Sequence, residues 1–307
     1  MNLYDLIIIG NGPAGLSAAI YAKRSGMNTL VISGNPVGGG QILDTYEIDN
    51  YPGLPGLTGT ELGKAFQDHA EKLGVIFSTE NVKEIEVDGD VRLVKTRKNE
   101  YSTKTVLIAT GAGHRELGVP GEAEHKGMGV SYCATCDGAF YKDKVVAVVG
   151  GGDVALEDAI YLSDIAEKVY LIHRRDEFRG AEILQDEVKS KANIEIIYDT
   201  VVEEIVGDMM IESLSLYNRK TGEKKSLNVN GVFIAVGILP NTSRIKGLPE
   251  MDESGYIKAG EDCVTSIEGI FAAGDVRTKM LRQVITAAAD GANAATSVKR
   301  YISGLKG

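Results

Sequence analysis

The length, composition and charge of the chain exclude several classes of protein. With 307 residues, 43% of them hydrophobic, the chain can form sizeable cores, and this length favours two domains. A net charge of −10 argues against a nucleic acid or an anionic membrane as partner, because both would repel an acidic surface. No stretch approaches about 20 apolar residues, and no basic segment precedes the first apolar run, so we expect a cytoplasmic protein.

The chain begins with the pattern of a dinucleotide-binding βαβ unit. Residues 5–9 and 29–33 are apolar runs typical of buried parallel strands, and a glycine-rich turn between them leads into a helical stretch. The first glycine makes the tight turn, the second lets the backbone approach a pyrophosphate, and the third lets the helix pack on the strand. The predicted nucleotide contacts are Gly10, Gly12, Pro13, Ala14 and Gly15.

The end of the second strand favours a flavin nucleotide over NAD. Ser33-Gly34-Asn35 stands where an acidic residue holds the ribose of NAD. Two polar, glycine-rich loops follow at 38–41 and 49–53, where a planar ring could lie against the backbone or the chain could make ordinary surface turns. A helix over 63–73 and several strands between 75 and 110 are expected before Gly111 ends the segment.

The motif Cys133-Ala134-Thr135-Cys136-Asp137-Gly138 is the predicted reaction centre, because two thiols at this spacing can close a reversible disulfide. The spacing alone also fits half of a zinc site or two buried thiols. Zinc needs about four ligands, but the only other cysteine is Cys263, and the four histidines form no paired spacing. The flanking nucleotide signatures therefore favour dithiol redox chemistry and no metal site.

A second copy of the βαβ pattern follows the cysteines. Strands are expected at 144–149 and 168–172, with the turn 150–155 between them. The second strand runs into His173-Arg174-Arg175, with Arg179 four positions further on. Arginines at this place accommodate the 2′-phosphate of NADP, although a solvated basic turn is the alternative. Strands and turns are expected over 201–233, and 238–248 is expected to be a linker.

The last segment contains an apolar strand that ends in Gly274-Asp275, followed by a helical stretch over 282–300. A carboxylate at the tip of a strand can hold a cofactor hydroxyl, or it can simply cap the helix.

Together these motifs resemble the low-molecular-weight bacterial thioredoxin reductases, which are FAD-containing flavoproteins. The resemblance covers nearly the whole chain and implies an α/β fold with two Rossmann-like, three-layer nucleotide-binding domains. It implies an FAD domain formed by residues 1–112 and 243–307, with an NADPH domain, residues 113–242, inserted into it and carrying the disulfide. It also implies a homodimer that passes hydride from NADPH to FAD, reduces Cys133–Cys136, and then reduces a thioredoxin by thiol exchange.

Residue roles follow from the same resemblance. Cys136 is the thiol expected beside the flavin, Cys133 the thiol that attacks the substrate disulfide, and Asp137 the acid/base. The residues expected to contact FAD are Gly10, Gly12, Pro13, Ala14, Gly15, Gly40, Gln41, Asn50, Ala109, Thr110, Gly111, Gly274, Asp275, Arg282, Gln283 and Val284. Those expected to contact NADPH are Gly150, Gly152, Asp153, Val154, Ala155, His173, Arg174, Arg175, Arg179 and Gly237.

Three positions depart from the family pattern. Val154 stands where many members have a hydroxyl that can reach the cofactor phosphate, which puts the strength of binding there in doubt. Met128 replaces an arginine of a well-known form of the motif, and Ala139 replaces an aromatic residue, which puts the identity of the partner in doubt. The alternatives are a same-fold enzyme fed by ferredoxin or acting on another disulfide, and a non-enzymatic flavin-binding subunit.

Overall fold

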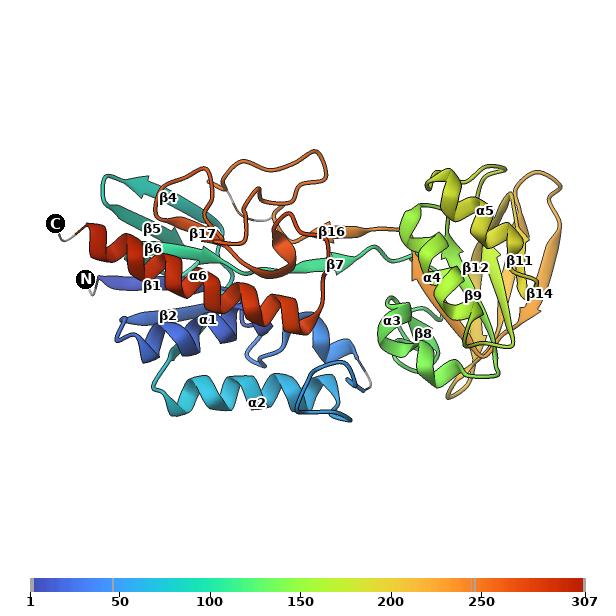
Figure 1. Cartoon of the computed structure of the whole chain (residues 1–307), viewed down its shortest axis with the longest axis horizontal. Coiled ribbons are helices and arrows are strands. Elements are labelled where there is room, and N and C mark those ends of the chain that lie inside the picture. Colours follow the sequence, from blue (N-terminus) through green and yellow to red (C-terminus); the bar gives the residue numbers. More distant parts are fainter. Residues whose placement is uncertain (1–2, 46, 244, 246, 306–307) are drawn as a thin grey trace. The chain divides into compact units, whose positions relative to one another are not determined.

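The computed structural model describes residues 3–45, 47–243, 245 and 247–305 (Figure 1). The chain forms two compact units, one of residues 1–113 and 239–307 and the other of residues 114–238. The sequence analysis expected the divisions after residues 112 and 242. Each unit is described by itself below, as unit 1 and unit 2.

Unit 1 is built around a mostly parallel sheet with the strand order β3-β2-β1-β6-β5-β4, and β17 pairs with β6 as a further parallel strand. Its elements are β1 (Tyr4–Ile9), α1 (Pro13–Arg24), β2 (Thr29–Ser33), η1 (Gly40–Asp44), α2 (Gly59–Lys72), β3 (Ile76–Thr79), β4 (Glu84–Asp88), β5 (Val91–Lys95), β6 (Glu100–Ile108), β17 (Ile270–Ala272), η3 (Gly274–Val276) and α6 (Val284–Gly304).

Successive side chains of β1 point to opposite faces of the sheet and enter two separate hydrophobic cores of unit 1. Leu6 and Ile8 belong to a buried cluster with the alanine-rich faces of α1 and α6, which pack against each other. Ile7 and Ile9 point to the other face and join a second cluster that includes Ile257. A strand with apolar residues on both faces is what a parallel sheet covered on both sides requires. Unit 1 is therefore layered, with helices on one face of its sheet.

Unit 2 repeats this plan around a second sheet with the order β11-β10-β9-β15-β8, in which all the pairings are parallel. Its elements are β8 (Val130–Ser131), α3 (Ala134–Asp137), η2 (Gly138–Tyr141), β9 (Val145–Gly150), α4 (Asp153–Ser163), β10 (Lys168–Ile172), α5 (Glu182–Ser190), β11 (Ile194–Ile197), β12 (Thr200–Gly207), β13 (Ile211–Asn218), β14 (Lys224–Asn228) and β15 (Gly231–Ala235).

The layers of unit 2 follow from the same alternation. Val146 and Val148 of β9 pack with residues of α4 and α5, whereas Ala147 and Val149 pack with the antiparallel sheet β12-β13-β14. Unit 2 thus has three layers, namely helices, a parallel sheet and an antiparallel sheet. The α/β fold class expected from the sequence is confirmed.

The prediction that residues 238–248 form a linker is partly wrong. Ile238–Pro240 forms the strand β16, which pairs with β7 (Ala112–His114). The chain passes from one unit to the other within these two strands, and the two strands are hydrogen-bonded to each other. None of the helices in the described part of the chain is long and apolar enough to cross a membrane.

Candidate active site

The predicted flavin motifs of unit 1 follow the carboxyl ends of adjacent parallel strands. The register pairs Ile9 with Ile108, and Ile108 with Ala272. The residues after these strand ends, Gly10, Ala109 and Ala273, therefore lie along one edge of the sheet. Ligands of open α/β sheets bind at this edge.

The glycine turn after β1 is closed so tightly that side chains would not fit. Gly10 has a φ of 112°, and a Cβ there would lie 2.3 Å from the carbonyl oxygen of Ala109. A Cβ on Gly15 would lie 2.0 Å from the carbonyl oxygen of Gly10. Gly12 is the N-cap of α1 and supplies no side-chain cap, so the first backbone N–H groups of the helix are left for an anion.

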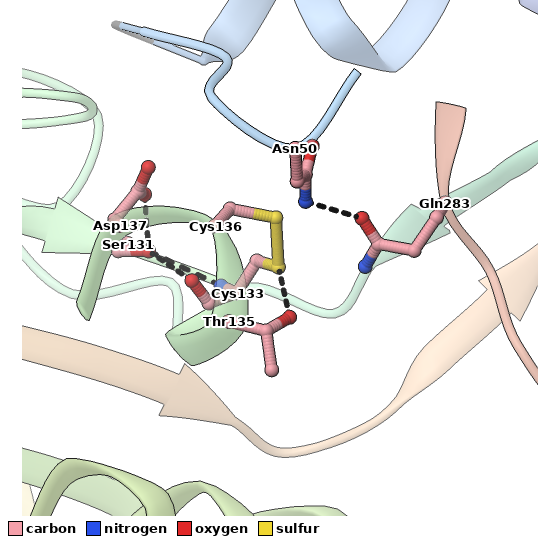
Figure 2. Close-up of a disulfide and its surroundings, with 7 residues drawn as sticks. All are labelled: Asn50, Ser131, Cys133, Thr135, Cys136, Asp137 and Gln283. Atoms are coloured by element: carbon pink, nitrogen blue, oxygen red, sulfur yellow. Dashed lines mark hydrogen bonds between the residues drawn. A yellow bond between two sulfur atoms is a disulfide. The ribbon is translucent and has the colours of Figure 1, made fainter. Parts of the chain in front are cut away.

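Two predicted flavin contacts from distant parts of the chain meet in unit 1. The Asn50 amide donates a hydrogen bond of 3.0 Å to the Oε1 atom of Gln283, which is the N-cap of α6 (Figure 2). Gly40, another predicted contact, lies against the phosphate turn, because a Cβ there would be 3.3 Å from the Cα of Gly12. The structure thus brings the Gly40 loop to the turn after β1 and the Asn50 loop to the start of α6.

Several buried polar atoms of unit 1 have no hydrogen-bond partner among the described residues. They include Thr110 Oγ1, Asp275 Oδ1 and Arg282 Nε. Burial raises the pKa of Asp275, although Lys279 and Arg282 oppose the shift. Unpartnered buried polar groups are rare in folded proteins. Because all three belong to residues predicted to contact FAD, the residues present fit a polar cofactor at this edge.

The sequence analysis missed Asn11, which organises the phosphate turn of unit 1. Its side-chain amide donates to the carbonyl oxygens of Asn35 and Val37, at 2.8 and 3.1 Å, and its Oδ1 accepts a hydrogen bond from Ser33. Ser33 is the residue that stands where NAD sites have an acid. Its hydroxyl therefore holds the turn through Asn11.

Asp290 of α6 was also missed, and it organises the loop that carries Asp275. Its carboxylate is 5% exposed and accepts hydrogen bonds from the Gly274 N–H at 2.9 Å, from Arg277 Nε at 2.8 Å and Nη2 at 2.7 Å, and from Lys279 Nζ at 2.9 Å. One buried carboxylate thus binds three points of the segment around Asp275. A pattern search for catalytic residues does not find it, because its partners lie 11 to 16 positions earlier in the chain and meet it only after folding.

The second glycine turn lies at the equivalent edge of unit 2. Val149 pairs with Ile172, and Gly150 pairs with Ala235, so the predicted NADPH motifs start at neighbouring strand ends. Gly152 is the N-cap of α4 without a side-chain cap, and a Cβ there would meet nothing within 4 Å. The residues fit a phosphate group at this open helix end.

The three arginines after β10 are exposed and available to an anion. Arg174, Arg175 and Arg179 lie on the surface of unit 2, and across the described residues none of them forms an ion pair with a carboxylate. Val154, the departure from the family pattern, is 51% exposed in the first turn of α4. Asp153, in contrast, is engaged in the protein, since its Oδ1 accepts a hydrogen bond of 2.7 Å from the N–H of Ala181.

The predicted reaction centre is a disulfide. Cys133 and Cys136 are joined by an S–S bond, with their Cα atoms 5.3 Å apart (Figure 2). Cys133 follows β8 and is the N-cap of α3, so the end of a parallel strand positions it. The Oγ1 atom of Thr135 lies 3.4 Å from the Cys133 sulfur. Cys263 is buried in the core of unit 1 and is a free thiol.

Ser131 connects the predicted acid/base to the disulfide, and the sequence analysis missed it. Its hydroxyl donates to Asp137 Oδ2 at 2.6 Å and accepts from the Cys133 N–H at 3.1 Å (Figure 2). The other carboxylate oxygen, Asp137 Oδ1, is buried without a partner among the described residues. Burial raises the pKa of Asp137, and the Ser131 hydrogen bond opposes that shift. A carboxyl group with a raised pKa suits proton transfer near neutral pH.

We expect Ser131→Ala to shift the pH dependence of disulfide turnover. Without the hydroxyl, burial acts unopposed, so the pKa of Asp137 should rise further, and the alkaline limb of kcat/KM, above which the carboxyl group no longer holds a proton to deliver, should move to higher pH. Ser131→Thr, which keeps a hydroxyl, should move the limb much less, and Asp137→Asn should remove it. A limb that stays in place in Ser131→Ala, or persists in Asp137→Asn, would belong to another group.

No cluster of three or more His, Cys, Asp or Glu side chains suited to a metal ion occurs among the described residues. A known protein family matches most of this chain. The sequence profile described as "Pyridine nucleotide-disulphide oxidoreductase" matches residues 4–291, and the chain belongs to this family.

Several relatives of 42–45% identity are thioredoxin reductases. The thioredoxin reductase of Peptoclostridium acidaminophilum is 44% identical, over 98% of this chain and 98% of that protein. The thioredoxin reductase of Bacillus subtilis (strain 168) is 42% identical, over 99% of this chain and 96% of that protein. The crystal structure of thioredoxin reductase from Streptococcus pyogenes MGAS5005 is 45% identical, covers 98% of this chain and 99% of that chain, and has a TM-score of 0.94.

The resemblance expected from the sequence is therefore confirmed, and the chain is a thioredoxin-reductase-type oxidoreductase. Its family works with a flavin and a pyridine nucleotide. The close cysteine pair on which the expectation depended is present.

Proposed function

We propose that this protein is an NADPH-dependent, FAD-containing enzyme that reduces the disulfide of thioredoxin through Cys133 and Cys136. The observation that carries the proposal is the Cys133–Cys136 disulfide, placed directly after a strand of a nucleotide-binding sheet. Relatives of nearly the same length and 42–44% identity are thioredoxin reductases, in agreement with the predicted enzyme.

Bound NADPH and FAD supply the hydride equivalent that reduces the disulfide, and the remaining steps belong to this chain. Cys133, as a thiolate, attacks one sulfur of the thioredoxin disulfide and forms a mixed disulfide, and the other thioredoxin sulfur leaves as a thiolate. Cys136 then attacks Cys133, which releases the second thioredoxin thiolate and restores the Cys133–Cys136 bond. Two electrons pass to thioredoxin, and two protons are taken up. Asp137 delivers one of these protons.

The two units divide the cofactors between them in this proposal. Unit 1 binds FAD, because Asp275 Oδ1, which has no hydrogen-bond partner among the described residues, and the uncapped start of α1 belong to it. Unit 2 binds NADPH, because the uncapped start of α4 belongs to it, as do the exposed arginines after β10, which form no ion pair among the described residues. The proposed domains are residues 1–112 with 243–307 and residues 113–242.

The proposed partner is a thioredoxin, or another protein with a thioredoxin-like disulfide. Met128 is 44% exposed, so it is available to a docked protein as an adaptable apolar side chain. Ala139 is exposed as well. The enzyme is proposed to act in the cytoplasm as a homodimer, without nucleic acid or membrane as a partner.

The test is anaerobic reduction of the purified protein followed by turnover. The protein should be yellow, with about one noncovalently bound FAD per chain, and NADPH should bleach the flavin. Added thioredoxin should then be reduced in proportion to the NADPH consumed. Bleaching by NADPH without reduction of any thioredoxin would leave a flavoenzyme with another disulfide substrate. Bleaching by reduced ferredoxin but not by NADPH would favour the ferredoxin-fed alternative.

Truncation of the arginines should weaken NADPH selectively. A charge-assisted hydrogen bond contributes about 1.5–3 kcal/mol, so Arg174→Ala, Arg175→Ala or Arg179→Ala should each cost roughly tenfold to a hundredfold in NADPH affinity. NADH affinity should hardly change, because NADH lacks the 2′-phosphate. The affinities can be measured by titration, with Arg300→Ala, an exposed arginine on α6, as the matched control. Equal losses for both nucleotides would contradict the assignment.

A further inference from the structure

His173 lies between the two loops of the proposed NADPH site. It directly follows β10, and its side chain is buried, with the residue 6% exposed. Its Nδ1 atom is 2.9 Å from the carbonyl oxygen of Gly150, and its Nε2 atom is 3.0 Å from the carbonyl oxygen of Glu177. Gly150 ends β9 and opens the phosphate turn, whereas Glu177 lies on the loop that leads to Arg179. One ring therefore contacts both loops.

These two contacts leave no ring nitrogen for a nucleotide. The sequence analysis expected His173 to contact NADPH together with the arginines that follow it. In the structure the arginines are exposed, but both nitrogens of the histidine face oxygens of the protein backbone. Its role at this site must therefore be exerted through the loops.

The second glycine of the phosphate turn supports the same conclusion. A Cβ on Gly151 would lie 2.2 Å from both the Cε1 and the Nδ1 atoms of His173, so the imidazole lies where that side chain would be. The backbone of Gly151 also accepts a hydrogen bond of 2.8 Å from the N–H of Arg179. The histidine ring is thus packed into the junction between the turn and the arginine loop.

The two carbonyl acceptors determine how many N–H groups the His173 ring needs in order to satisfy both of them. A carbonyl oxygen only accepts hydrogen bonds, and a neutral imidazole carries one N–H group, so it can satisfy only one of the two. An imidazolium carries two N–H groups and satisfies both. The protonated ring therefore joins the loops by two hydrogen bonds, and the neutral ring joins them by one.

The charges around the ring connect this proton to the nucleotide. Burial lowers the pKa of His173, the two carbonyl contacts oppose that shift, and Arg175 and Arg174 lower the pKa further by repulsion. An anionic phosphate beside these arginines would remove the repulsion and raise the pKa. The other titratable side chains on the surrounding elements are Asp153, Asp176, Glu177, Arg179, Tyr198 and Asp199.

We propose that His173 is a positioning residue of the pyridine-nucleotide site, which joins the Gly150 turn to the Glu177–Arg179 loop and takes up a proton when the 2′-phosphate binds. The inference rests on the proposed NADPH site of unit 2. In this proposal His173 holds the two loops of the site in position, and the arginines contact the phosphate.

Two variants separate the two hydrogen bonds. In His173→Asn the side-chain amide can replace the Nδ1–H donor toward Gly150, and in His173→Gln it can reach toward Glu177. Neither side chain titrates. Binding of NADP⁺ and NAD⁺ to the FAD-loaded protein is measured by calorimetry in buffers of different ionisation enthalpy, between about pH 6 and 8. Thermal unfolding and FAD content identify variants that are simply misfolded.

The wild type should take up more protons with NADP⁺ than either variant, by up to about one proton per site. Proton release from the phosphate itself cancels in this difference, because the arginines are unchanged. Each variant should bind NADP⁺ and NAD⁺ roughly tenfold more weakly, because both nucleotides use the phosphate turn. Arg174→Ala should weaken NADP⁺ alone.

Other outcomes would overturn the proposal. Equal proton uptake in the wild type and the variants would show that protonation of His173 is not coupled to phosphate binding. A loss of affinity confined to NADP⁺ would show that His173 contacts the 2′-phosphate directly. If the wild type bound neither nucleotide, the proposed function would fail. The free protein would still test the contacts with Gly150 and Glu177, because ¹⁵N NMR should then show one protected N–H on the His173 ring near neutral pH and two in acid. A ring with no protected N–H at any pH would contradict them.

Discussion

Cys133→Ser and Cys136→Ser should each lower thioredoxin reduction by roughly 10³-fold or more, since the reaction needs both thiols of one disulfide. The two variants should differ in what they trap. In Cys136→Ser, Cys133 can still attack thioredoxin, but no second thiol resolves the mixed disulfide, so a covalent complex should accumulate. Cys133→Ser should form none if Cys136 does not attack the partner.

The measurement uses each variant after reduction by dithiothreitol and removal of the reductant, with thioredoxin detected by mass spectrometry under non-reducing conditions. This readout does not depend on bound cofactor. Cys263→Ser is the matched control, because that thiol is buried, burial raises its pKa to about 12, and it should neither trap thioredoxin nor alter turnover. A complex trapped by Cys133→Ser and not by Cys136→Ser would exchange the roles of the two thiols.

Asp290→Asn should destabilise unit 1 strongly. The carboxylate is paired with Arg277 and Lys279, whose side chains are 10% and 7% exposed, so the substitution leaves two buried cations without their anion. Removing one partner of a buried ion pair costs about 3–5 kcal/mol of the free energy of unfolding. Urea unfolding followed by circular dichroism measures the loss. Asp68→Asn, which removes the exposed Lys64–Asp68 pair, is the control and should change little.

The same substitution should alter stability in acid. Burial would raise the pKa of Asp290, but the hydrogen bonds from Arg277 and Lys279 outweigh burial and lower the pKa below its ordinary value. A lowered pKa in the folded state contributes stability above the pKa of the unfolded chain, and that contribution is lost as the pH falls through the folded-state value. The wild type should therefore lose stability in acid more steeply than Asp290→Asn. Parallel acid limbs would mean that another carboxyl group controls acid unfolding.

Local patterns predicted the frame of both units well. The apolar runs at 29–33 and 168–172 are strands with those bounds, because a strand buried on both faces needs an unbroken apolar run. The glycine turns also lie at the expected strand ends, since tight backbone approach leaves no alternative to glycine at Gly10. The helix expected over 63–73 begins earlier, at Gly59, because Thr58 and Glu61 form a capping box.

The supporting residues of the sites were not predictable in the same way. Asn11, Ser131 and Asp290 act through partners chosen by tertiary structure, such as a backbone N–H group or a charged side chain from another element. Their residue types are ordinary in a single sequence. His173 shows the same difficulty, because the motif predicts a nucleotide contact, whereas in the fold both ring nitrogens face backbone oxygens of the protein. Local sequence patterns predict where strands end, whereas tertiary packing determines which side chains face the ligand.

The split sheet of unit 1 has a consequence for synthesis of the protein on the ribosome. Val106 of β6 pairs with Ile270 of β17, and α6, which follows β17, packs on α1, so unit 1 cannot complete its core until β17 and α6 have been synthesised. All of unit 2 lies between these two partners in the chain. We therefore expect unit 2 to fold before unit 1, while the N-terminal strands of unit 1 keep their apolar faces exposed to chaperones.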